Sequence, residues 1–127
     1  AMAAGIATLK QLQKPRFYQA LEENSARLAE GLGRIAQRLG VEVTVNRVGS
    51  MMGLFLREEA PTSFEEAQKA DGDTFSLLHR AALERGVFLA PSPFEAGFVS
   101  TEHDDGVIDE TLEAFRDAAR EVADRRE

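Results

Sequence analysis

Few side chains in this 127-residue sequence are of types that carry out acid–base or covalent chemistry. His79 and His103 are its two histidines, and histidine is the side chain whose unperturbed pKa lies closest to neutrality. His79 falls within a helical pattern, which favours a surface or boundary position. His103 is followed by Asp104 and Asp105, which stand where a helix begins, and no second histidine is nearby. We therefore predict helix capping there rather than a metal site.

The three lysines, Lys10, Lys14 and Lys69, all fall on the polar faces of helical patterns. A lysine that forms a Schiff base needs a buried, apolar setting that lowers its pKa, so we expect no catalytic lysine here. The sequence has no cysteine, and no glycine-rich phosphate-binding loop follows a strand. We therefore assign no catalytic, cofactor-binding or metal-binding residue to this sequence.

One segment is unusual for either a solvated loop or a core strand. Residues 86–100 read GVFLAPSPFEAGFVS, with three phenylalanines, two prolines and one carboxylate, Glu95. A carboxylate among apolar neighbours is costly to bury unless it meets a partner. Such a segment commonly packs on another domain or lines a pocket. The alternative is that Glu95 accepts hydrogen bonds from the backbone of its own proline-rich turn.

The elements that must position this segment are read from hydrophobic periodicity. Gly31 and Gly33 weaken one of the predicted helices, so tertiary packing must help to hold it. Helices are predicted over 2–12, over 17–39 with a stop at Gly40, just after Thr62 and Ser63, around 75–82 with a stop at Gly86, and over 108–122 with Asp104 or Asp105 as its cap.

Strands are predicted near residues 41–48, 51–57, 87–90 and 97–99, with tight polar breaks between the first two. Short connections of this kind favour an antiparallel sheet. The sequence therefore predicts a single α+β domain over residues 1–127, with a sheet of three to four strands and helices packed on one face.

The charge and hydropathy of the sequence argue against two classes of partner, nucleic acids and membranes. The net charge is −7, and residues 102–127 alone hold ten acidic and four basic side chains. Such a surface repels phosphate backbones, so we expect no nucleic-acid partner. No apolar run reaches about 18 residues, and no secretory leader opens the sequence. We therefore expect no membrane partner and a cytoplasmic location. The sequence enters a helical pattern directly at its first residues, which suggests a helix that continues from a preceding domain.

Two runs carry a resemblance to a known family. RVGSMMGLF at residues 47–55 and the segment at 86–100, with His103 shortly after it, closely resemble the C-terminal part of glutamate-1-semialdehyde 2,1-aminomutase. The opening AMAAGIATL is similar to a helix of the same family. The resemblance covers essentially the whole sequence, and FEAGFVS is its most specific piece, since related class III aminotransferases share the layout but seldom this wording.

The resemblance implies an origin in a homodimeric pyridoxal-phosphate enzyme of fold type I. That family isomerises glutamate 1-semialdehyde to 5-aminolevulinate, a tetrapyrrole precursor, with the cofactor as electron sink and amine carrier. Its Schiff-base lysine and its phosphate-binding residues belong to a large domain whose motifs do not map here. The implied unit is the small C-terminal domain, with residues 1–14 in the helix that leads into it from the large domain. We expect it to be inactive alone and to bind no pyridoxal phosphate.

In proteins that resemble this one, the FEAG segment lies at the mouth of the active site. The resemblance therefore implies that Glu95 faces cofactor and substrate, where its charge would orient the substrate amine or influence the cofactor lysine. Ser50 and Met51, in the glycine turn of the other matching run, are weaker candidates for the same substrate-side wall. Two alternatives stay open: another class III aminotransferase, and an independent α+β binding module.

Overall fold

The computed structural model of the protein describes residues 1–125 as five helices and three strands. In chain order these are α1 (Met2–Leu12), α2 (Phe17–Arg38), β1 (Thr44–Val48), β2 (Met51–Phe55), α3 (Phe64–Ala67), α4 (Gly72–Glu84), β3 (Gly97–Phe98) and α5 (Asp105–Asp124). The predicted helices all form. In this described range, no helix is both long enough and apolar enough to cross a membrane.

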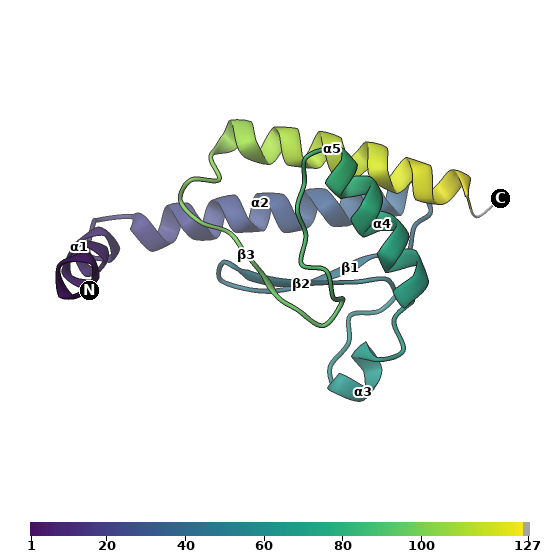
Figure 1. The fold of residues 1–127 in the computed structure, drawn as a ribbon, viewed down its shortest axis with the longest axis horizontal. Coiled ribbons are helices and arrows are strands. Elements are labelled where there is room, and N and C mark those ends of the chain that lie inside the picture. The colour runs from purple at the N-terminus through teal and green to yellow at the C-terminus, as the bar shows by residue number, and fades with distance from the viewer. Residues whose placement is uncertain (126–127) are drawn as a thin grey trace.

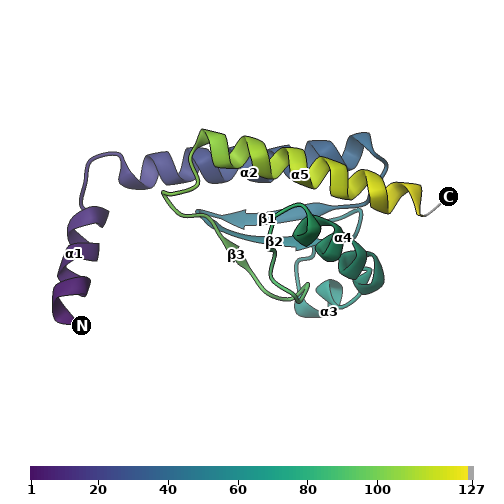
Figure 2. The ribbon, with the colours of Figure 1, turned by 45° about the horizontal axis from the view of Figure 1, so that its top comes forward.

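The three strands form one antiparallel sheet in the order β1-β2-β3. Helices α2 and α5 lie side by side over the sheet, and α4 packs against α5, whereas α1 projects from one end of the molecule (Figures 1 and 2). The predicted α+β class, with a small antiparallel sheet and helices packed on one face, is confirmed.

The core lies between these helices and the sheet. Its largest fully buried side chains include Leu78 from α4 and Ile108, Phe115 and Val122 from α5. Each comes from the apolar stripe that the helical periodicity predicts. Helix α1 contributes no buried residue, and its apolar side chains Met2, Ile6 and Leu9 are exposed, whereas Leu12 is half-buried.

The first strand begins later than predicted because the preceding residues complete a helix cap. Gly40 adopts a φ of 67°, the left-handed conformation that glycine tolerates best. It lets the Val41 N–H bond the Ala36 carbonyl at 3.0 Å, the Schellman arrangement at the end of α2. Val41 is therefore buried against the helix, and the ladder of β1 starts at Thr44.

The predicted strand at residues 87–90 is wrong, for the same physical reason. Gly86, with a φ of 84°, ends α4, and the Val87 N–H bonds the Ala82 carbonyl at 3.0 Å. The Leu89 carbonyl accepts a hydrogen bond from Nε2 of His79 at 3.1 Å. The Val87 N–H and the Leu89 carbonyl, which pairing with another strand would need, are thus bonded to α4. No strand forms at residues 87–90.

The two glycines of α2 differ in what surrounds them, and this yields a paired prediction. A Cβ at Gly33 would meet no atom within 4 Å, whereas a Cβ at Gly31 would lie 2.6 Å from Cδ2 of Leu112 on α5. Gly33→Ala should therefore raise the free energy of unfolding by about 0.5–1 kcal/mol. Gly31→Ala should gain clearly less, because Leu112 must move. Urea unfolding of both variants checks this, and equal gains would contradict it.

Candidate functional site

The segment at residues 86–100 is held at both ends and crosses the sheet between them. It leaves the cap of α4, turns at the Pro-Ser-Pro run and returns as β3, where Met52 faces Gly97 and Met51 faces Phe98. Within the turn, the Phe94 N–H bonds Oγ of Ser92 and the Glu95 N–H bonds the Ser92 carbonyl, each at 3.2 Å. The turn is therefore organised by a serine, as in common Ser/Thr turns.

Ser50 lies just before β2, at the end of the β2–β3 pair away from the Pro-Ser-Pro turn. Gly49, with a φ of 59°, and Ser50 form the two-residue hairpin between β1 and β2, a loop type that favours glycine first. The Ser50 carbonyl accepts a hydrogen bond from the Val99 N–H at 2.9 Å. The structure thus joins the two runs of sequence that carry the resemblance, RVGSMMGLF and FEAGFVS.

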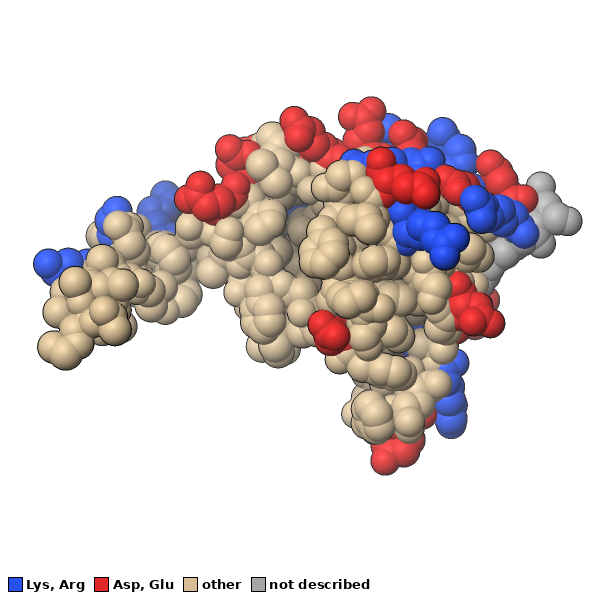
Figure 3. Space-filling model, in the orientation of Figure 1, with Lys and Arg blue, Asp and Glu red and all other residues tan. Residues whose placement is uncertain are grey.

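An open cavity of about 340 Å³ lies between this segment, the sheet and helices α2 and α5. Its walls are mostly apolar, with side chains such as Leu54, Phe88 and Val107. Its polar lining comes from Ser92, Glu95, His103 and Thr111. Figure 3 shows the face of the molecule seen in Figure 1 as largely uncharged, with its charged side chains gathered mainly over α5. An apolar hollow with few polar groups is the usual form of a small-molecule site.

Glu95 is exposed at this cavity. Among the described residues, the Glu95 carboxylate accepts no hydrogen bond from the turn that carries it. The backbone N–H groups of Phe94 and Glu95 bond to Ser92 instead. The alternative in which Glu95 serves its own turn is therefore not supported. An exposed carboxylate on an uncharged face is available to a group outside the described chain.

Glu95 and the two other wall candidates do not form one cluster. Met51 pairs with Phe98 at the hairpin end of β2, whereas Glu95 lies in the bend that precedes β3. Side chains alternate along a strand, so Met51 points to the face opposite that of Met52 and Leu54, which line the cavity. Met51 is 44% exposed, and Ser50 is half-buried. Of the three candidates, Glu95 lines the cavity, and Ser50 and Met51 do not.

His103 also lines the cavity, although the sequence alone gave no functional role to this residue. Its Nδ1 accepts a hydrogen bond from the Ser100 N–H at 2.9 Å, and Oγ of Ser100 lies 3.1 Å away. Because Nδ1 is an acceptor, the neutral ring carries its proton on Nε2 and offers a donor. Its position three residues after FEAGFVS is the one sequence signal that points to it.

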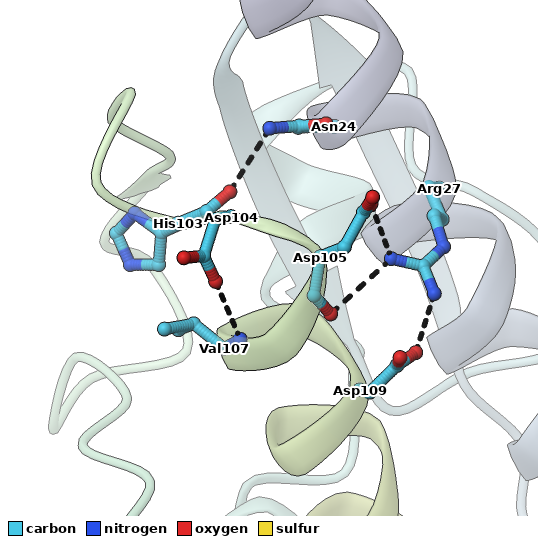
Figure 4. A network of polar contacts seen from close by, with 7 residues as sticks. All are labelled: Asn24, Arg27, His103, Asp104, Asp105, Val107 and Asp109. Atoms are coloured by element: carbon cyan, nitrogen blue, oxygen red, sulfur yellow. Dashed lines mark hydrogen bonds and ion pairs between the residues drawn. The ribbon is translucent and has the colours of Figure 1, made fainter.

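The acids beside His103 are used to fix α5. Asp104 caps the helix, accepting the Val107 N–H at 3.0 Å, and the carboxylates of Asp105 and Asp109 both contact Arg27 of α2 (Figure 4). The Asp105 contact measures 2.9 Å. Asp104 rather than Asp105 is therefore the cap, as one of the two predicted options, and these acids join α5 to α2. In residues 1–125, no group of three or more potential metal ligands occurs.

His79 and the lysines are the other ionisable side chains considered in the sequence. His79 is half-buried between the rings of Phe75 and Phe88, with centroid distances of 6.2 and 6.3 Å, so it is a boundary residue, as predicted. All three lysines are exposed. Lys10 lies on α1 as predicted, whereas Lys14 and Lys69 lie in turns just after α1 and α3, so their predicted helical positions are wrong.

The chain is similar to known proteins over nearly its whole length. It is 53% identical over 116 residues to the glutamate-1-semialdehyde 2,1-aminomutase of Desulfosudis oleivorans, which covers 91% of this chain and 27% of that protein. The solved glutamate-1-semialdehyde aminomutase of Pseudomonas aeruginosa shares the fold, with a TM-score of 0.77 and 22% identity over 91% of this chain and 26% of that one.

A second solved structure also shares the fold. The FumI protein of a Sphingopyxis species, described as its PLP internal aldimine form, matches with a TM-score of 0.75 and 27% identity, over 95% of this chain and 26% of that one. No family model matches the sequence. The chain thus spans about a quarter of the length of the relatives it matches, and in sequence and fold it is similar to that part of a glutamate-1-semialdehyde 2,1-aminomutase.

Proposed function

We propose that this chain acts as the small C-terminal domain of a cytoplasmic, homodimeric, pyridoxal-phosphate-dependent aminomutase. The enzyme would isomerise glutamate 1-semialdehyde to 5-aminolevulinate for tetrapyrrole synthesis, and residues 1–14 would belong to the helix that leads in from a large cofactor-binding domain. The observation that carries the proposal is the 53% identity over 116 residues to an aminomutase.

In this proposal the cavity face is one wall of the active-site entrance. Glu95 is the ionisable group on the segment at 86–100, and it is exposed at the cavity. A carboxylate there would attract and orient the ammonium group of the substrate, and it would favour the charged form of a nearby lysine. Ser50 and Met51, at the hairpin end of β2, would contribute a second part of the wall.

The exposed apolar surface supports a missing partner domain. Met2, Ile6 and Leu9 on α1 are 82%, 53% and 61% exposed, and Phe88 and Phe98 are 75% and 69% exposed. Exposed apolar surface of this kind commonly marks an interface, and here we assign it to the large domain and the dimer partner.

The residues of this chain do not fit a resident pyridoxal phosphate. The cofactor needs a lysine whose pKa is lowered by an apolar setting, whereas Lys10, Lys14 and Lys69 are all exposed. The proposal therefore assigns the cofactor, its lysine and its phosphate site to the large domain. The contribution of this chain is the wall that faces them.

This assignment gives a prediction for the isolated chain. After incubation with pyridoxal phosphate and reduction with borohydride, we expect labelling that is spread over the three lysines. At each lysine it should stay well below one label per chain, as expected for an exposed lysine that reacts without specific binding. Mass spectrometry of the digested protein measures it. Stoichiometric labelling of one lysine would contradict the assignment of the cofactor to a different domain.

A chimera tests the proposed function. The matching quarter of the Desulfosudis oleivorans aminomutase is replaced by this chain, and production of 5-aminolevulinate is followed without any added keto acid or amino donor. We expect turnover within about tenfold of the parent, since volume-conserving substitutions in a core are well tolerated. A folded, cofactor-loaded chimera that turns over only when an amino donor and a keto acid are supplied would favour an aminotransferase. One that turns over neither way would contradict the proposal.

A further inference from the structure

Helix α3 touches the turn that carries Glu95. Although it has only four residues, its Phe64 meets Phe94, with ring centroids 5.7 Å apart and planes inclined by 55°. Both rings are largely exposed, at 61% and 53%, so the contact is a surface pair rather than a part of the core. Figures 1 and 2 both place α3 beside the tip of the segment that connects α4 to β3.

The first turn of α3 is held by more bonds than a short surface helix requires. Oγ of Ser63 accepts the Glu66 N–H at 3.2 Å, and the Glu66 carboxylate accepts the N–H and the hydroxyl of Thr62 at 2.8 and 3.0 Å. This is the predicted capping box, extended by one residue. The hydrogen bonds from the Thr62 backbone and side chain lower the pKa of the Glu66 carboxyl, which therefore stays ionised at neutral pH.

Two further bonds tie α3 to the sheet. The Asn46 amide of β1 donates to the Pro61 carbonyl at 2.9 Å, and Arg57, just after β2, donates to the Glu66 carbonyl at 2.8 Å. Pro61, just before the helix, and Ala67, its last residue, are both buried. Phe64 is therefore presented from a fixed base on the rigid part of the domain.

The turn on the other side of the contact has weaker support. Its two hydrogen bonds, to Ser92 from the backbone N–H groups of Phe94 and Glu95, both lie within the turn. These bonds shape the turn, and its nearest pairing with the sheet is that of Gly97 with Met52, two residues beyond Glu95. The ring of Phe94, one residue before Glu95, is the group that meets an element anchored to the sheet.

We propose that Phe64 is a positioning residue, which holds Phe94 from α3 and thereby sets where the Glu95 carboxylate stands at the cavity. This rests on the proposed function of Glu95. Removing the ring contact would leave the turn folded but free to shift, so that the carboxylate spends less time in its working position. A shift of about 1 Å in such a group is enough to lower turnover substantially.

The contact is tested first in the 127-residue chain by amide hydrogen exchange, read by NMR. Phe64→Ala and Phe94→Ala should each speed exchange of the Glu95 amide by about 2- to 10-fold, the equivalent of one aromatic pair. The double variant should be no faster than the quicker single one, because both remove the same contact. Tyr18→Ala is the matched control, since it removes an exposed ring from the surface pair that Tyr18 forms with Phe17 on α2. Unchanged exchange in Phe64→Ala, or additive effects, would overturn the proposal.

The consequence for turnover is tested in the aminomutase chimera. Phe64→Ala should lower kcat by about 3- to 10-fold, Phe64→Tyr should restore it, and Phe64→Ala should cause no further loss in a Glu95→Gln background. Faster exchange with unchanged kcat would show that the contact exists but positions nothing for the reaction, and would overturn the proposal. A silent Glu95→Gln would instead overturn the role of Glu95 on which it rests, while the exchange result still stood.

Discussion

Replacing Phe115 by alanine is expected to lower the free energy of unfolding of this domain by about 3–5 kcal/mol. The ring is 1% exposed and lies at the centre of α5, the helix against which both α2 and α4 pack. Alanine would leave a cavity that the neighbouring side chains fill only in part. Because small domains are stable by about 5–15 kcal/mol, this change removes a large share of the total.

Urea unfolding, followed by circular dichroism, measures this loss. Phe88→Ala is the matched control, because the same side chain is 75% exposed there and its removal should cost less than about 1 kcal/mol. In a thermal scan, the Phe115 variant should melt about 10–20 °C below the parent. Similar losses for the two variants would show that the core does not lie where the structure places it.

In the chimera that carries this chain, Glu95→Gln should lower kcat/KM for glutamate 1-semialdehyde by about 10- to 100-fold. The substitution keeps the shape of the side chain and removes its charge. The expected loss corresponds to about 1.5–3 kcal/mol, the usual worth of a hydrogen bond to a charged group. If Glu95 also acts on the cofactor lysine, the pH dependence of the cofactor absorption should shift in the same variant.

Glu110→Gln supplies the control for Glu95→Gln. Glu110 is an exposed acid on α5 that does not line the cavity, so the same chemical change there should leave kcat/KM within about twofold of the parent. Steady-state kinetics from about pH 6 to pH 9 compare the two variants with their parent. A Glu95 variant that matches its parent in turnover and spectra would make Glu95 a structural residue.

Hydrophobic periodicity was sufficient to predict the helices and the fold class. The stripe of α5, with Ile108, Phe115 and Val122, has the same spacing in the sequence as in the core. The failure at residues 87–90 has a specific cause: an apolar run of four residues reads equally as a strand or as an extended segment. Its hydrogen bonds are to α4, which no local pattern reveals.

The candidate site was harder to predict, because it depends on contacts between distant residues. The composition of residues 86–100 singles out Glu95 in the sequence. It does not reveal that Ser92 accepts the hydrogen bonds of the turn and that the Glu95 carboxylate stays exposed. His103 lines the cavity together with residues of other elements. Phe64 contacts Phe94, which is 30 residues away in the sequence. Such pairs follow from the packing of elements, which short-range patterns do not specify.

The most direct measurement is a crystal structure of the chimera with pyridoxal phosphate bound. We expect segment 86–100 to line the entrance above the cofactor, with the Glu95 carboxylate directed at the substrate side and α1 buried against the large domain. Ser50 and Met51 should lie on the same wall, separated from Glu95 along β2. A structure in which segment 86–100 faces solvent, away from the cofactor, would contradict the account.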